Sequence, residues 1–103
     1  MIPGVNIENA SYPVGICAER SALSSAISSF PHEKIIGIAI SYISLRENDK
    51  PIFPCGMCRQ FMLECENRNG FPIKIILSAQ EEEVIIINQA RDLLPFDFNG
   101  SAI

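Results

Sequence analysis

The sequence predicts an α/β fold in which helices pack on a sheet. Apolar residues recur at helical spacing in two segments, and a long apolar, β-branched run lies between them. Two shorter apolar segments follow the second helix, so the expected order is α-β-α-β-β. With 103 residues, 48% of them hydrophobic, the chain is expected to be one globular domain that spans residues 1–103.

The first two elements have different periodicities. Between residues 18 and 30 the apolar stripe is Ala18, Ala22, Leu23, Ala26, Ile27 and Phe30. This spacing predicts a helix that ends before Pro31. Residues 34–44 are apolar almost throughout, which is typical of a strand covered on both faces, so we expect this strand to be central.

The second helix is expected to begin beside Cys55, after a polar loop at 45–54, and to end at Asn69-Gly70. Its apolar stripe is Met57, Cys58, Phe61, Met62 and Cys65. Short strands at 73–78 and 84–88 flank an acidic turn at 80–83, and residues 89–94 suit one closing helical turn.

Charge and hydropathy exclude several classes of partner. Twelve acidic and 8 basic side chains give a net charge of −4 and a pI near 4.8. Nucleic-acid-binding domains typically carry a net positive charge instead. No apolar run reaches the ~18 residues of a membrane span, and no signal peptide is recognisable. We therefore expect a cytoplasmic protein with a small-molecule ligand, whose four cysteines are thiols, ligands or catalysts.

Two short motifs predict a catalytic zinc site. Cys55 and Cys58 open a helix as a C-x-x-C pair, and Cys17 opens another helix, so three thiolates can hold one Zn²⁺ per chain and leave a position for water. Glu19, which is not itself needed as a ligand, is placed to carry protons.

Three thiolates carry more negative charge than zinc can balance, so positive groups are expected nearby. Both helix N-termini are suitable, and Arg20 and Arg59 lie next to motif residues. We expect one or both arginines to donate hydrogen bonds to thiolate sulfur and so tune the metal.

The cysteines also fit two other hypotheses. A structural zinc site would need a fourth ligand, but Cys65 lies on the apolar stripe and His32 follows Pro31 in a loop. A C-x-x-C pair at a helix start is also typical of thiol-disulfide redox proteins. That hypothesis gives no role to Cys17 or Glu19.

Four runs carry a family resemblance: NIENASY at 6–12, CAER at 17–20, PCGMCRQ at 54–60 and LLPFDF at 93–98. Together they resemble the small homotetrameric, zinc-dependent cytidine deaminases, with Cys17 in place of the histidine ligand of other branches. The resemblance implies a three-layer α/β/α fold with a mixed sheet. It also implies zinc-dependent hydrolytic deamination of cytidine or deoxycytidine, as a step of pyrimidine salvage.

The resemblance assigns roles residue by residue. Cys17, Cys55 and Cys58 would bind zinc, and Glu19 would protonate the base at N3, deprotonate the attacking water and pass a proton to the departing ammonia. Asn6 and Glu8 would hold the ribose hydroxyls, and the backbone at Ala18 and Cys55 would contact the pyrimidine edge. Phe98 would pack into the active site of a neighbouring subunit.

One departure from the family concerns the N-terminus. Members of the family have a helix and a β-hairpin before the N-x-E segment, whereas this chain begins three residues before Gly4. We therefore expect the N-terminal strands to be missing from the sheet, as in a truncated reading frame, a fragment or an incomplete sequence of a longer protein. A deaminase relic that binds zinc without turnover is the remaining hypothesis, and the choice between cytidine and deoxycytidine stays open.

Overall fold

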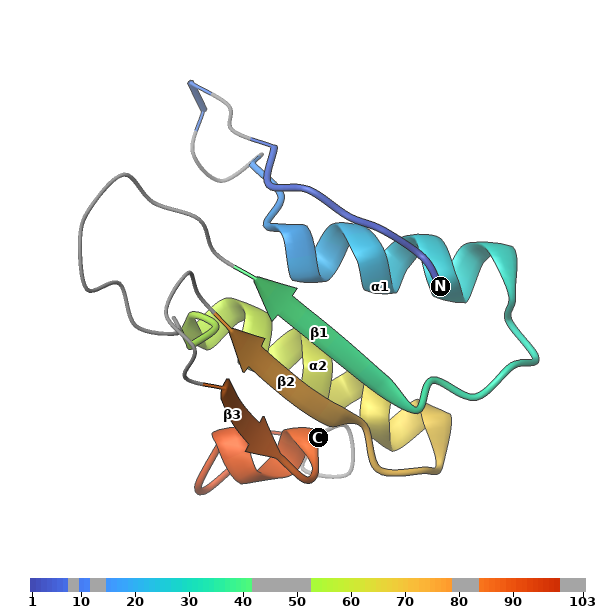
Figure 1. Cartoon of the computed structure of the whole chain (residues 1–103), viewed down its shortest axis with the longest axis vertical. Coiled ribbons are helices and arrows are strands. Elements are labelled where there is room, and N and C mark those ends of the chain that lie inside the picture. Colours follow the sequence, from blue (N-terminus) through green and yellow to red (C-terminus); the bar gives the residue numbers. More distant parts are fainter. Residues whose placement is uncertain (8–9, 12–14, 42–52, 79–83, 99–103) are drawn as a thin grey trace.

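The computed structural model describes residues 1–7, 10–11, 15–41, 53–78 and 84–98 (Figure 1). The element bounds are α1 Ala18–Ser29, β1 Gly37–Ser41, α2 Gly56–Asn69, β2 Lys74–Ser78, β3 Val84–Ile87 and the 3₁₀ helix η2 Ala90–Leu93. The expected order of elements and the α/β class are confirmed. The acidic turn at 80–83 and residues 42–44 of the first expected strand lie outside the described residues.

The three strands form a mixed sheet in the order β1-β2-β3. β1 is parallel to β2, and β2 is antiparallel to β3, so β2 is the central strand of the described sheet. The prediction of a central, doubly covered strand at 34–44 is therefore wrong for this part of the chain. Along β1, exposed residues alternate with the half-buried Ile38 and Ile40, because helices cover only one face.

The core lies between that face and the helices. Its buried members come from α1, α2, β2 and η2 and include Leu23, Met62, Ile75, Leu77, Ala90 and Leu93. Ile38 and Ile85 pack against this cluster from the outer strands. On the opposite face Val84 and Ile86 are exposed, so the described residues form two layers, the sheet and one layer of helices (Figure 1).

The C-terminus of α2 is closed by the residues that were expected to end it. Gly70 adopts a left-handed conformation with φ of 67°, which glycine accepts without steric conflict. The Asn69 side chain accepts the Ile35 N–H at 2.8 Å and donates to the Ile35 carbonyl at 2.8 Å, and this pair fixes the entry to β1.

No helix in the described ranges is long and apolar enough to cross a membrane.

The N-terminal segment lies along α1 (Figure 1). A Cβ atom on Gly4 would come within 2.6 Å of the Ala22 nitrogen and 2.7 Å of the Ala18 carbonyl oxygen, so only glycine permits this close approach. Farther along, Ile7 and Ile16 exchange both backbone hydrogen bonds, at 2.7 and 2.9 Å. The segment is thereby held against the start of α1.

We expect Gly4→Ala to release this segment, since the added methyl group meets backbone atoms that cannot yield. The local loss should be about 1–3 kcal/mol, in the range of overpacking substitutions. Hydrogen exchange at the Ile7 and Ile16 amides would report it as faster exchange. Gly56→Ala is the matched control, because a methyl group there has no neighbour within 4 Å. Unchanged protection in Gly4→Ala would show that the packing on α1 is not needed.

Candidate metal centre

The N-termini of the two helices place two cysteine side chains at one site. Cys17 is the N-cap of α1 and Cys55 is the N-cap of α2, and both have extended backbones. Their carbonyls accept the first helical hydrogen bonds, from the Ser21 N–H at 3.0 Å and the Arg59 N–H at 2.9 Å. Neither thiol caps its helix, so both sulfurs are available as ligands at the positive ends of the helix dipoles.

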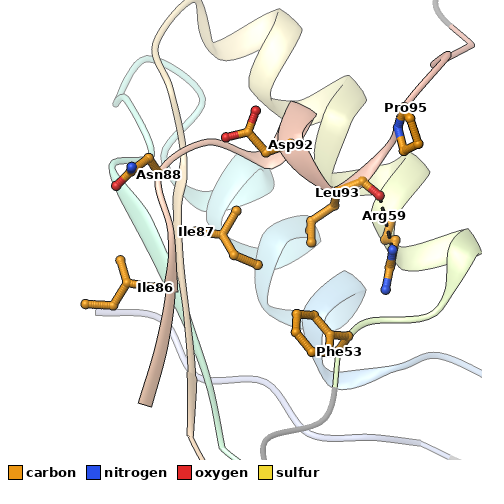
Figure 2. Close-up of a pocket in the computed structure, with 8 residues that line it drawn as sticks. All are labelled: Phe53, Arg59, Ile86, Ile87, Asn88, Asp92, Leu93 and Pro95. Carbon is orange, nitrogen blue, oxygen red and sulfur yellow. Dashed lines mark hydrogen bonds between the residues drawn. The ribbon is translucent and has the colours of Figure 1, made fainter.

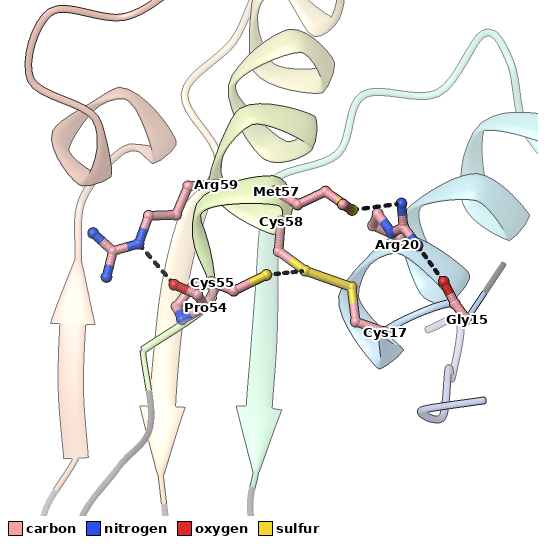
Figure 3. Close-up of a disulfide and its surroundings, with 8 residues drawn as sticks. All are labelled: Gly15, Cys17, Arg20, Pro54, Cys55, Met57, Cys58 and Arg59. Atoms are coloured by element: carbon pink, nitrogen blue, oxygen red, sulfur yellow. Dashed lines mark hydrogen bonds between the residues drawn. A yellow bond between two sulfur atoms is a disulfide. The ribbon is translucent and has the colours of Figure 1, made fainter. Parts of the chain in front are cut away.

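The sulfurs of Cys17, Cys55 and Cys58 converge (Figure 3). Cys55 Sγ lies 3.5 Å from Cys58 Sγ, close to the ~3.8 Å expected for two thiolates on a tetrahedral zinc with bonds of ~2.3 Å. The sulfurs of Cys17 and Cys58 are joined in Figure 3 as a disulfide. Their Cα atoms are 7.5 Å apart, beyond the ~4.4–6.8 Å usual for disulfides. This backbone spacing is better suited to two thiolates that share a metal ion.

The Glu19 carboxylate belongs to the same site. One of its oxygens and the sulfurs of Cys17 and Cys58 all lie within 4.8 Å of one another. Cys58 is 1% exposed, whereas Cys55 is exposed, so the site opens to solvent on one side. Soft sulfur donors and one nearby carboxylate form a donor set that fits zinc.

A cavity of about 730 Å³ adjoins the sulfurs. Its lining includes all three cysteines and, from the N-terminal segment, Asn6. The Ile7–Ile16 bridge carries Asn6 to this position, because Ile16 directly precedes Cys17. Glu8 lies outside the described residues.

Ala18 and Phe98 occupy different surroundings. Ala18 is the first residue of α1, next to Cys17, and its carbonyl faces Gly4. Phe98 is 58% exposed, and its carbonyl accepts a hydrogen bond from Gln60 Nε2 on α2 at 3.0 Å. Phe98 does not line the cavity at the cysteines, and its expected role toward a neighbouring subunit stays a prediction.

Both arginines differ from the expected geometry, because their hydrogen bonds in the described part of the chain go to groups other than cysteine sulfur. Arg20 donates to the Gly15 carbonyl at 2.7 Å and to Met57 Sδ at 3.2 Å (Figure 3). These hydrogen bonds, one to a backbone carbonyl and one to a thioether sulfur, compete with any contact to the thiolates. Arg20 therefore braces the segment that precedes Cys17.

Arg59 braces the other ligand segment. It donates to the Pro54 carbonyl at 2.7 Å and to the Leu93 carbonyl at 3.1 Å. Its guanidinium lies 6.0 Å from the Phe53 ring centroid. Arg59, Phe53 and Leu93 are among the residues that line a separate hollow of about 600 Å³ (Figure 2). The hydrogen bond from Arg59 to the Leu93 carbonyl links the start of α2 to η2. An effect of either arginine on the metal stays a prediction.

The two alternative fourth ligands lie elsewhere. Cys65 is 6% exposed and belongs to the core cluster, where burial raises the pKa of its thiol and Arg68 only partly offsets the rise. His32 is an exposed turn residue. Cys65 is thus a small buried apolar side chain, as expected. Neither Cys65 nor His32 is placed to be the fourth ligand that a closed structural zinc site needs.

Met57 lines the cavity, although the sequence motifs gave it no role in the site. Met57 was predicted on the apolar face of the second helix, but its side chain is 62% exposed and lines the cavity. It lies in the first turn of α2, where the next residue, Cys58, is the buried one, at 1% exposed. Met57 lies between the two cysteines of the C-x-x-C pair, and this position could have indicated that it lines the site.

A model of the cytidine and deoxycytidylate deaminase zinc-binding region matches residues 1–71. The chain belongs to this deaminase family. The cytidine deaminase of Mycoplasma genitalium is 49% identical over 61 residues, which are 59% of this chain and 44% of that protein. The cytidine deaminase of Halalkalibacterium halodurans is 44% identical over 64 residues, 62% of this chain and 45% of that protein.

Solved deaminase structures extend the match to most of the fold. A cytidine deaminase from Burkholderia pseudomallei superposes on this chain with a TM-score of 0.72 at 37% identity. The superposition covers 92% of this chain and 69% of the Burkholderia chain. A cytidine deaminase from Mycobacterium leprae gives a TM-score of 0.56 at 30% identity and covers 91% and 67%. The sequence matches to the two curated relatives thus span less than half of each deaminase.

Proposed function

We propose that this chain carries the zinc-dependent centre for hydrolytic deamination of cytidine or deoxycytidine, with uridine or deoxyuridine and ammonia as products. The observation that carries the proposal is the convergence of three cysteine sulfurs at a cavity that also reaches Asn6, with a Glu19 carboxylate oxygen within 4.8 Å of the Cys17 and Cys58 sulfurs. Metal donors, a proton carrier and a polar contact for substrate are thus present in one place.

Cys17, Cys55 and Cys58 would hold the zinc. Bound zinc supplies hydrolytic chemistry, since it activates a water as a nucleophile near neutral pH. Glu19 accepts the proton that this water loses and delivers it to N3 of the base, which makes C4 electrophilic. Glu19 then moves a second proton to the exocyclic nitrogen, which leaves as ammonia. One water is consumed for each nucleoside.

Substrate recognition would begin at Asn6. Its side-chain amide can both donate and accept hydrogen bonds, which suits a sugar hydroxyl. The resemblance assigns the ribose to this segment, with Glu8 as the second contact. We extend the proposal to a cytoplasmic enzyme of pyrimidine salvage that forms homotetramers, in which Phe98 reaches a neighbouring active site.

Two other functions remain as competitors. A thiol-disulfide redox protein would use Cys55 and Cys58 alone, but Cys17 Sγ contacts Cys58 Sγ, so the third cysteine belongs to the same site. A zinc-binding relic without turnover would show the same ligands. Glu19 within 4.8 Å of two ligand sulfurs argues for retained acid-base chemistry.

The test is to purify the chain under reducing conditions, measure zinc by elemental analysis, and follow the absorbance of cytidine and of deoxycytidine. We expect one zinc per chain and turnover of at least one nucleoside, with loss of turnover after chelation and recovery after zinc is restored. Zinc without turnover would favour the relic. A metal-free protein with a reactive thiol would favour the redox function.

A further inference from the structure

Met57 is an exposed apolar side chain at a place where the fold does not need one. It is 62% exposed and is not part of the core cluster. Instead it lines the cavity together with Asn6, Ile16 and Cys58. A large apolar side chain kept at the mouth of a polar site is suited to contact a ligand.

The Met57 side chain is held toward the cavity. Arg20 Nη1 donates to its sulfur at 3.2 Å, and Arg20 Nη2 donates to the Gly15 carbonyl at 2.7 Å. Figure 3 shows Met57 reaching from α2 toward α1 across the cysteine sulfurs. The contact with Arg20 therefore restrains a side chain that is otherwise flexible.

We propose that Met57, held by Arg20, forms an apolar wall of the cavity against which the flat pyrimidine ring of the substrate packs. The inference rests on the proposed deaminase function. Met57 and Cys58 line the same cavity, so a ring that reacts beside Cys58 lies within reach of the Met57 side chain. A thioether makes favourable contacts with aromatic rings. Ile7 and Ile16, which are 52% and 41% exposed, add apolar surface from the N-terminal segment.

The test compares Met57→Ala and Met57→Leu with the zinc-loaded wild type in cytidine turnover and in equilibrium binding of cytidine. We expect Met57→Ala to raise KM and the dissociation constant roughly three- to tenfold with kcat unchanged. Met57→Leu should restore most of the binding, because it keeps the apolar volume. Zinc content and thermal stability should not change. Ile36→Ala, which removes a 73% exposed side chain outside the cavity, is the control.

Three results would overturn the inference. An unchanged KM in Met57→Ala would show that Met57 does not contact the base. A fall in kcat with loss of zinc would assign Met57 to the metal site. Failure of Met57→Leu to restore binding would show that the sulfur contact with Arg20 matters rather than the apolar surface. If zinc-loaded wild type neither binds nor converts cytidine, the proposed function fails first, and the inference fails with it.

Discussion

Glu19→Gln is expected to abolish turnover while zinc stays bound. Glutamine has nearly the same shape as glutamate but cannot accept the proton from water, and general acid-base groups contribute roughly 10²–10⁴-fold to rate. In the proposed site the three cysteines hold the metal, so the zinc content should remain that of the wild type. Nucleoside turnover and elemental analysis on the same sample would measure both properties.

Glu33→Gln is the matched control, since Glu33 is an exposed residue after the end of α1. It should keep full activity. Glu19→Gln protein that still deaminates cytidine at the wild-type rate would exclude Glu19 as the proton carrier. Loss of zinc in the same variant would instead identify Glu19 as a ligand, which its distance of no more than 4.8 Å from the sulfurs also permits.

Glu66→Ala is expected to cause the largest loss of stability. Glu66 is 3% exposed, and its carboxylate accepts hydrogen bonds from the backbone N–H groups of Ile73 at 2.8 Å, Ala90 at 2.6 Å and Arg91 at 3.1 Å. Alanine would leave these amides without a partner, and a buried unsatisfied donor costs about 1–3 kcal/mol. We expect a total loss of about 3 kcal/mol or more in urea unfolding.

The chain offers a close control for this experiment. Glu64 lies on the same helix and is exposed, so Glu64→Ala should change stability by no more than about 0.5 kcal/mol. Glu66→Gln should fall between the two, because the amide keeps one acceptor oxygen but turns an N–H group toward a backbone donor. Equal stability of the Glu66 and Glu64 variants would show that the hydrogen bonds of Glu66 are replaced by water.

Local patterns predicted the helices well and brought the candidate metal ligands to notice. The apolar stripe of α2 identified Met62, and Gly70 ended the helix as expected, because helical period and capping depend on neighbouring residues. The three cysteines that the structure brings together could be picked out for a similar reason. Their chemistry needs specific residue types at fixed spacing, and Cys17 and Cys55 occupy matching N-cap positions.

Properties that depend on distant segments could not be predicted in this way. The edge position of β1 depends on which strands lie beside it, and a run of isoleucines does not encode that. Arg59 was expected at sulfur but bonds to Leu93, 34 residues away. No sequence pattern indicated the buried hydrogen bonds of Glu66, because its partners lie 7, 24 and 25 residues farther along the chain.

The positions of Cys17 and Cys58 have a further consequence for the unfolded chain. These residues are 41 positions apart, and each lies in the first turn or at the cap of its own helix. A metal ion that joins them closes a loop, and for a covalent link of this length the loss of chain entropy in the unfolded state corresponds to about 4 kcal/mol. The metal centre would then act as a removable cross-link. Zinc supply would decide how readily this small chain folds as well as whether it reacts.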